Sequence, residues 1–154
     1  MAKTVADVMT PNPFTVTPDT ILKDAIQTMA NNHIGGLPVV DEGGTLQGIL
    51  SESDLMWQTT GIEMPTYITL LDSVIYLKNP NQYNQEIHKA LGQLVRDVMT
   101  NKVHTITPDQ SLRQAAQLMH DKHIRRLPVV DPQGAVVGML TRGDIVREMA
   151  SSYE

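Results

Sequence analysis

The 154-residue sequence contains no cysteine, which excludes disulfide bridges, thiolate metal sites and cysteine nucleophiles. Aromatic residues are scarce at 4%, so aliphatic side chains and nine methionines must build the hydrophobic core. No apolar run approaches the roughly 20 residues of a membrane span, and the first residues lack the apolar centre of a signal peptide. These absences predict a globular cytoplasmic protein with no membrane partner.

Positive charge is also in deficit. Twelve Lys and Arg residues against seventeen Asp and Glu residues give a net charge of −5, so no general attraction to nucleic acid is expected. The charge is unevenly distributed, because residues 5–55 carry a net −6 and residues 95–145 carry a net +2. An anion-binding site is therefore expected near the second half.

The sequence does contain one motif written twice. A shift of 90 residues aligns 5–55 with 95–145 without a gap and gives 24 identities in 51 positions. Three phrases recur in the same order: Asp-Val-Met-Thr at 7–10 and 97–100, Leu-Pro-Val-Val-Asp at 37–41 and 127–131, and Gly-x-Leu-Ser/Thr-x-x-Asp at 48–54 and 138–144. Such a match indicates a duplicated structural unit.

Each copy predicts a small α/β unit. An extended piece at Thr15-Val16 precedes a helix that Thr17 is expected to cap, with Pro18 as its first residue, and Thr107-Pro108 repeats this pattern. Apolar residues at helical spacing predict the buried face of this helix: Leu22, Ala25, Ile26 and Met29 in the first copy, and Leu112, Ala115, Ala116 and Met119 in the second.

Two strands and a second helix follow in each copy. Strands are predicted at 37–40 and 46–50 and again at 127–130 and 136–140, and Ser51 and Thr141 are expected to open the second helices. A three-stranded sheet with two helices leaves one sheet face uncovered. The two copies are therefore expected to pack together about a pseudo-twofold axis.

The residues between the copies, 56–94, have no counterpart in the repeat. They contain two apolar stripes at helical spacing, which predict two connector helices. These helices either pack against their own module or form an interface for a second subunit or client protein. The stripes consist of Tyr67, Ile68, Leu71, Val74 and Ile75, and of Tyr83, Ile87, Leu91 and Leu94.

The three repeated phrases resemble the tandem cystathionine-beta-synthase (CBS) domain family over about two-thirds of the chain. The resemblance implies a Bateman module with a CBS repeat at 1–58, a connector at 59–94 and a CBS repeat at 95–154. The connector resembles the insert of stand-alone CBS-pair proteins, so no separate catalytic domain is expected. The family binds adenosine-containing ligands in clefts between the repeats, usually as a flat homodimer.

The resemblance also implies ligand-binding roles. Asp54 and Asp144 would accept hydrogen bonds from ribose hydroxyls, while Ser51 and Thr141 would hold phosphate or sugar oxygens. Taken alone, the same residues have the spacing of helix caps. The candidate nucleotide-binding residues are Thr15, Val16, Ile34, Gly36, Pro38, Ser51 and Asp54 in the first copy, and Thr105, Ile106, Ile124, Arg125, Arg126, Leu127, Pro128, Met139, Thr141, Arg142 and Asp144 in the second.

Basic residues distinguish the two copies. The second copy has Arg125-Arg126 where the first has Gly35-Gly36, and guanidinium groups grip phosphate oxygens in pairs. Arg142 follows Thr141 at the start of a predicted helix, where a cation is unfavourable unless an anion compensates. The main site is therefore expected around Thr141 and Asp144. The arginines could instead end a solvated strand, and the glycines either widen or loosen the first cleft.

No residues point to catalysis. The sequence lacks a Walker loop, a Gly-x-Gly-x-x-Gly fingerprint, a Gly-x-Ser-x-Gly elbow and a His-Glu-x-x-His pair. His33 and His123 are more typical of packing groups than of metal or phosphate ligands. Asp41 and Glu42 are expected to be solvated in a turn. We expect no metal site and no catalytic cofactor.

These observations predict a non-catalytic energy sensor that binds AMP, ADP or ATP, with or without magnesium. It would form a homodimer and signal to an unknown client protein by a conformational or dimer change. The alternatives are a ligand-independent dimerisation or scaffold module with vestigial clefts, a cyclic di-AMP or S-adenosylmethionine sensor and, last, a nucleotide-converting enzyme.

Overall fold

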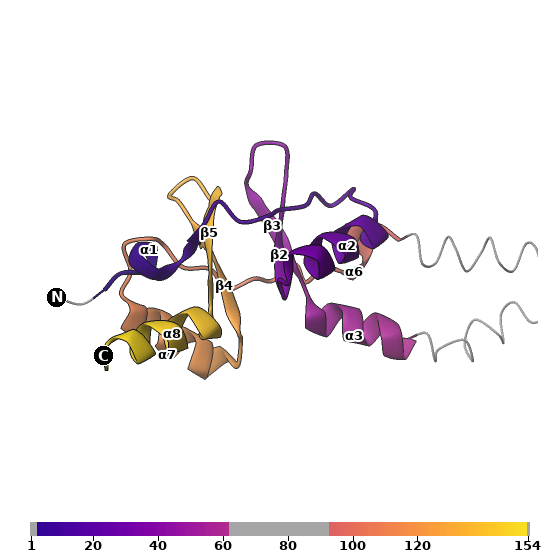
Figure 1. The fold of residues 1–154 in the computed structure, drawn as a ribbon. Coiled ribbons are helices and arrows are strands. Elements are labelled where there is room, and N and C mark those ends of the chain that lie inside the picture. Colours follow the sequence, from indigo (N-terminus) through magenta and orange to yellow (C-terminus); the bar gives the residue numbers. More distant parts are fainter. Residues whose placement is uncertain (1–2, 62–92, 154) are drawn as a thin grey trace, which may run out of the picture.

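The structure is a computed structural model that describes residues 3–61 and 93–153 (Figure 1). It is an α/β fold made of two similar halves. The helices and the two-stranded hairpin of the first copy recur 90 residues later, but the strand Thr10–Pro11 is matched only by an isolated bridge at Thr100, so one sheet has three strands and the other two. The first copy contains α1 (Val5–Val8), β1 (Thr10–Pro11), α2 (Leu22–Asn32), β2 (Gly36–Val40), β3 (Leu46–Ser51) and α3 (Glu52–Gly61). The second contains α6 (Val95–Val98), α7 (Leu112–Lys122), β4 (Arg126–Val130), β5 (Val136–Thr141) and α8 (Arg142–Ser151).

The predicted strands and second helices are confirmed. β2 pairs with β3 and β4 pairs with β5 as antiparallel hairpins, while Thr15-Val16 contributes a parallel bridge from Val16 to Val39. The predicted connector stripes lie outside the described residues, apart from Leu94. Within residues 3–61 and 93–153, no helix has both the length and the apolar character needed to cross a membrane.

The expected start of the first helix in each copy was wrong. The helices begin at Leu22 and Leu112, and residues 17–20 form a turn instead, in which the amide of Thr20 donates to the carbonyl of Thr17. The reason is that the carbonyls of Pro18 and Thr20 accept hydrogen bonds from the first amides of α6. These carbonyls are therefore engaged by another segment of the chain.

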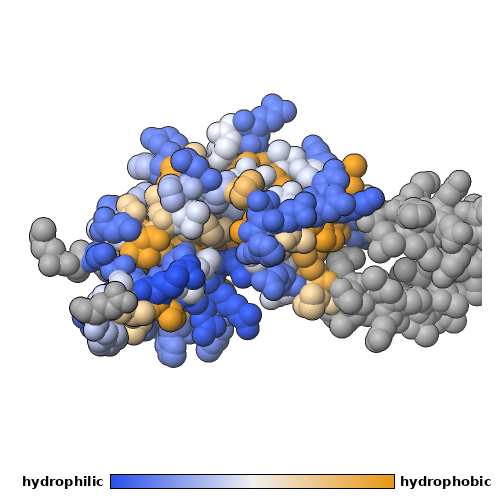
Figure 2. All heavy atoms as spheres, viewed as in Figure 1, coloured by the Kyte–Doolittle hydropathy of each residue, from blue (hydrophilic) through white to orange (hydrophobic). Residues whose placement is uncertain are grey.

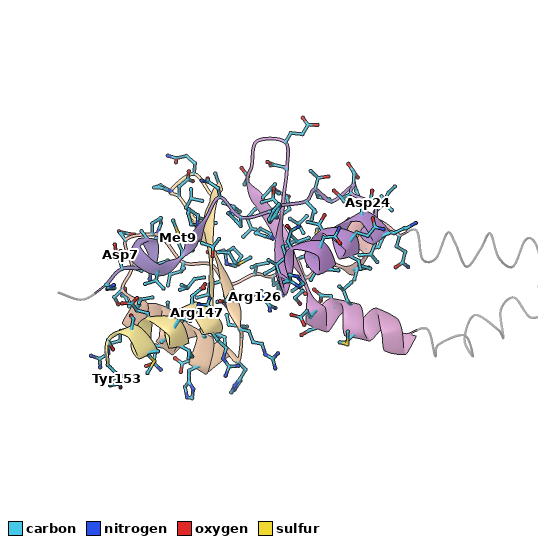
Figure 3. All side chains as sticks on the ribbon, viewed as in Figure 1. Asp7, Met9, Asp24, Arg126, Arg147 and Tyr153 are labelled. Carbon is cyan, nitrogen blue, oxygen red and sulfur yellow. The ribbon has the colours of Figure 1, made fainter. Side chains whose placement is uncertain are left out.

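The two copies exchange segments. α1 and β1 of the first copy pack with the second copy, and α6 and Thr100 of the second copy pack with the first. We call these the exchanged segments. Val5 of α1 is fully buried in the core formed by α7, β4 and β5, whereas Val95 of α6 is fully buried in the core formed by α2, β2 and β3. β1 likewise pairs with β5, and Thr100 bridges to Ile49 of β3. Figure 3 shows the exchange, because Asp7 and Met9 lie in the half that contains α7 and α8.

Glycine is required at the two positions, 48 in β3 and 138 in β5, where an exchanged segment lies directly against the strand. A Cβ atom on Gly48 would lie 2.7 Å from the carbonyl oxygen of Thr100, and one on Gly138 would lie 3.1 Å from that of Thr10. A Cβ atom so close to a backbone oxygen forces one of the two strands to move. The Gly-x-Leu phrase of each copy therefore serves the exchange.

The pseudo-twofold relation of the halves is visible in a reciprocal pair of hydrogen bonds. The amide of Leu46 donates to the carbonyl of Gly134 at 3.1 Å, and the amide of Val136 donates to that of Gly44 at the same distance. Since 44 corresponds to 134 and 46 to 136, the axis passes between Thr45 and Ala135, which form an antiparallel bridge.

The predicted buried faces of the first helices are confirmed in part, since Leu112 and Ala116 are only half-buried. Ala25, Met29, Ala115 and Met119 are buried in the two cores, but Ile26 has 40% of its surface exposed. Ile26 lies on the outer face of α2, since the sheet lies against the other face. Hydrophobic residues are scattered among hydrophilic ones on the face drawn in Figure 2.

Candidate functional site

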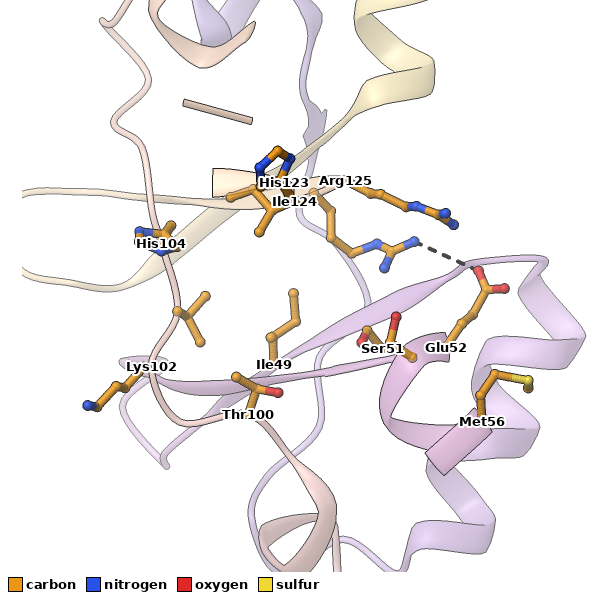
Figure 4. A pocket seen from close by; sticks show the side chains of 13 residues that line it. Ile49, Ser51, Glu52, Met56, Thr100, Lys102, His104, His123, Ile124 and Arg125 are labelled. Carbon is orange, nitrogen blue, oxygen red and sulfur yellow. Dashed lines mark ion pairs between the residues drawn. The ribbon is translucent and has the colours of Figure 1, made fainter. Parts of the chain in front are cut away.

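A cleft of about 700 Å³ lies between the two halves and draws on both. Its size falls in the range of small-molecule sites, roughly 300–1,000 Å³. Figure 4 shows Ile49, Ser51 and Thr100 on one side facing His123, Ile124 and Arg125 on the other. The full lining consists of Ile49, Ser51, Glu52, Ser53, Met56, Thr100, Lys102, Val103, His104, His123, Ile124, Arg125 and Arg126.

On the first-copy side, Asp54 in the first turn of α3 does not itself line the cleft but holds two residues that do, Ser51 and Thr100. Its Oδ2 accepts hydrogen bonds from the amide of Ser51 at 2.9 Å and from the hydroxyl of Ser51 at 3.1 Å. Its Oδ1 accepts a hydrogen bond from the hydroxyl of Thr100 at 3.0 Å. The half-buried carboxylate therefore joins the end of β3, the start of α3 and the exchanged segment.

The second-copy side contributes Arg126, which crosses toward the first copy. A Cβ atom on Gly36 would lie 2.5 Å from Cδ of Arg126, and one on Gly35 would lie 2.5 Å from its Nη2. The stem of the arginine thus lies on Gly36 and its guanidinium lies on Gly35. The glycine pair neither widens nor loosens the cleft; it makes room for Arg126. In Figure 3 the arginine is seen between the two halves.

Arg126 is held in a poorly solvated position. Its side chain is 18% exposed, and its Nη2 lies 3.8 Å from Oε1 of Glu52 at the start of α3. Burial lowers the pKa of the guanidinium, the Glu52 carboxylate opposes that shift, and the charge of Arg125 reinforces it. Arginine nevertheless stays protonated at neutral pH. The cleft therefore holds a permanent cation with little water around it.

The balance of charge in the cleft favours an anion. Lys102, Arg125 and Arg126 line it, and among the described lining residues Glu52 is the one carboxylate. All three cations come from the second copy or from the segment after α6, in keeping with the net charge of that half. They face the Ser51–Asp54 motif of the first copy.

The Thr141–Asp144 motif is arranged differently. The amide of Thr141 donates to Oδ2 of Asp144 at 2.8 Å, and the amide of Asp144 donates to the hydroxyl of Thr141 at 3.2 Å, which completes the predicted capping box. Nη2 of Arg147 donates to Oδ1 of Asp144 at 2.5 Å. Neither Thr141 nor Asp144 belongs to the lining of the 700 Å³ cleft.

Arg142 lies outside the cleft as well. It is exposed at the start of α8 and lines a shallower groove of about 400 Å³ between α7 and α8, together with Ala116, Met119 and Val146. Ile124 and Arg125 line both hollows. The structure therefore brings Ser51, Ile124, Arg125 and Arg126 together and leaves Arg142 on another face.

The remaining candidates do not line the cleft and lie in the strands or in the segments next to them. Val16 donates its amide to the carbonyl of Pro38 at 3.1 Å, and Ile106 does the same with Pro128. Thr15 is exposed, while Thr105, Ile34 and Gly36 are half-buried. The residues with buried side chains are Val16, Pro38, Ile106, Leu127, Pro128 and Met139.

Sequence reasoning missed Glu52, Thr100, Lys102 and His104. Thr100 ends the repeated Asp-Val-Met-Thr phrase, and that repetition was the available signal, but nothing local indicates that it reaches Asp54. The expected packing role of His33 and His123 was wrong, because both are exposed; with left-handed φ values of 53° and 55° they end α2 and α7, and His123 lines the cleft. Among the described residues, no group of three or more His, Cys, Asp or Glu side chains could hold a metal ion.

Comparison with known proteins agrees with this arrangement. A family model for the CBS domain matches residues 5–58 and 95–151. CBS domain-containing protein CBSX2, chloroplastic, of Arabidopsis thaliana is 36% identical over 94% of this chain and 62% of its own length. Protein MJ1426 of Methanocaldococcus jannaschii is 35% identical over 94% of this chain and 90% of its own length. A crystal structure of CBSX2 in complex with AMP superposes with a TM-score of 0.75 and 32% identity, covering 99% of both chains.

Proposed function

The chain belongs to the CBS domain family, and from this premise we propose that it is a non-catalytic regulatory module that binds an adenine nucleotide between its two copies. The observation that carries the proposal is Arg126, a desolvated cation that crosses the cleft to the Ser51–Asp54 motif. CBSX2, whose structure covers the whole chain, was crystallised with AMP.

The cleft offers a partner for each part of a nucleotide. We assign the ribose hydroxyls to Asp54, which would exchange its bond from Thr100 for bonds from the ligand. Arg125, Arg126 and Lys102 are assigned to the phosphate, because guanidinium groups bind phosphate oxygens in pairs. Ile49 and Ile124 supply apolar surface for the base.

A second site is proposed around Thr141 and Asp144, with Met139 and Arg142, as the repeat suggests. Occupation of this site requires Asp144 to release Arg147, whose ion pair with it measures 2.5 Å. Asp54 must likewise give up its bond from Thr100, but Ser51 lines the cleft together with Arg125 and Arg126, whereas Thr141 does not. We therefore propose the Ser51–Asp54 motif as the primary site.

Ligand binding is the first prediction. An adenine nucleotide at a hundredfold excess over its Kd is expected to stabilise the fold by about 2.7 kcal/mol, because it binds only the native state. For this chain length that raises Tm by on the order of 5–10 °C. A thermal-shift screen over AMP, ADP, ATP, cyclic di-AMP and S-adenosylmethionine, with and without magnesium, measures it.

The outcome of the screen separates the candidate functions. If no adenosine compound raises Tm and calorimetry detects no heat, the sensor proposal fails and a ligand-independent scaffold takes its place. Turnover of ATP to a new product would identify an enzyme. A ligand can change the module only through different affinities for two arrangements. The output to a client protein is therefore proposed to be a change in the packing of the copies or subunits.

Self-association is the second prediction. Ile26, Met56, Val146 and Met149 expose large apolar side chains on α2, α3 and α8. Apolar helix faces of this kind are expected to be covered by a second copy in a twofold dimer. Light scattering at high micromolar concentration should give twice the chain mass of 17.0 kDa. A mass of 17.0 kDa would show that the exposed residues remain in solvent.

A further inference from the structure

At three equivalent positions of the repeat, the two copies have residues of different size and charge. Gly35, Gly36 and Glu52 of the first copy correspond to Arg125, Arg126 and Arg142 of the second. The first three contribute a charge of −1 and the second three a charge of +3. In both copies these positions are joined by the same backbone bond, from residue 52 to 35 at 3.1 Å and from residue 142 to 125 at 2.9 Å. The three substitutions therefore fall at one structural locus.

This locus of the first copy fits Arg126 in both shape and charge. A Cβ atom at position 36 would meet Cδ of Arg126 at 2.5 Å and its Nε at 3.0 Å, so any residue other than glycine there would displace the arginine from this position. Glu52 supplies a negative charge at 3.8 Å from the guanidinium, whereas an arginine there would repel it. The first copy thus provides a position that accommodates one arginine of the second copy.

The two members of the ion pair differ in how firmly they are held. Arg126 is 18% exposed and its stem is enclosed by the glycine pair, whereas the Glu52 side chain is 66% exposed. Their separation of 3.8 Å is longer than a hydrogen bond. The cation is therefore fixed while the carboxylate can move into solvent. Figure 4 shows Glu52 at one edge of the cleft, with its ion pair drawn as a dashed line.

We infer that Glu52 is an exchangeable counter-anion of Arg126, which neutralises the guanidinium in the free protein and is displaced by the phosphate of a ligand. This inference rests on the proposed function and deepens it, because it makes Glu52 the residue that sets how strongly the cleft prefers phosphorylated ligands. A carboxylate beside the anion site weakens the binding of every phosphate and leaves an uncharged nucleoside unaffected.

The test compares Glu52→Gln with Glu42→Gln, a matched control. Glu42 is an exposed carboxylate in the turn between β2 and β3, outside the cleft lining, so both variants lose one negative charge. Calorimetry is performed with AMP, adenosine and pyrophosphate. Glu52→Gln is expected to tighten AMP and pyrophosphate about threefold to tenfold, in line with a partly exposed ion pair, and to leave adenosine unchanged. The gain should shrink as salt is raised.

A double variant tests the connection to Arg126. If Glu52 acts through this arginine, the gain from Glu52→Gln disappears in an Arg126→Met background. An equal gain in both backgrounds would mean that Glu52 acts only as a general negative charge, which overturns the inference.

The outcomes separate this inference from the proposed function. If AMP binds Glu52→Gln and the natural protein equally, the inference is wrong and the nucleotide site stands. If no adenosine compound binds but Glu52→Gln still tightens pyrophosphate, the counter-anion role stands and the nucleotide assignment fails. If neither pyrophosphate nor any nucleotide binds, both are overturned.

Discussion

Arg126→Met is expected to weaken AMP binding at least tenfold, because each hydrogen bond between a guanidinium and a phosphate contributes about 1.5–3 kcal/mol. Methionine keeps the apolar stem that lies on Gly36 and removes only the charged end. Adenosine binding should change little. Calorimetry with AMP and adenosine measures the difference between the two ligands.

The same substitution should leave the free protein as stable as before, or more stable. Arg126 is largely buried with one carboxylate at 3.8 Å, and a desolvated charge with so distant a partner recovers little of its hydration energy. Urea unfolding measures this. The control is Arg113→Met on the exposed surface of α7, which should alter neither quantity. Unchanged AMP affinity in Arg126→Met would remove this residue from the phosphate site.

Asp54→Ala is expected to lower both binding and stability. It leaves the amide of Ser51 and the hydroxyl of Thr100 without their acceptor, which should reduce the free energy of unfolding by about 1–3 kcal/mol. Loss of the proposed ribose contact should weaken AMP about tenfold or more. Binding is measured by calorimetry at a temperature where the variant remains folded, and stability by urea unfolding.

Two other carboxylates serve as controls. Asp97→Ala removes a similar cap, since Asp97 accepts from the amide of Leu94 at 3.0 Å, but Leu94 does not line the cleft, whereas the partners of Asp54 do. It should cost stability without weakening AMP. Asp144→Ala should weaken AMP less than Asp54→Ala does. The opposite order would identify the Thr141–Asp144 motif as the main site.

The sequence predicts the opposite ranking, with Asp144→Ala weakening AMP binding more than Asp54→Ala. The ranking changes because of how the two copies pack against each other. Alignment of the repeats assigns Arg125 and Arg126 to their own copy, hence to Thr141 and Asp144. In the structure the arginine side chain is directed away from its own motif, across the pseudo-twofold axis, to Gly35 and Glu52. The local sequence shows which side chains are charged or can form hydrogen bonds. Which residue each of them contacts depends on packing between segments far apart in the chain.

The same distinction explains which parts of the fold were predicted. The strands at 37–40 and 46–50 follow from two short apolar segments that flank the turn residues 41–44, so the local sequence suffices. The start of α2 at Leu22 depends on bonds from α6 to the carbonyls of Pro18 and Thr20. Thr17 and Pro18 have the correct local chemistry for a helix start, and a tertiary contact overrides it. The exchange of α1 and α6 was missed for the same reason.

The exchange also determines when during synthesis the protein can fold. A nascent chain that has reached residue 61 contains α2, β2, β3 and α3, but it lacks Val95 for the core and Thr100 for the partner of β3. At 5–20 residues per second, the ribosome needs roughly two to eight seconds to supply them. Val5 remains unburied for longer still, because its core is formed by α7, β4 and β5 near the C-terminal end of the chain. The first half cannot reach its native state before residues 95–100 are made, so the apolar faces of the first copy depend on chaperones or on slow collapse during that interval.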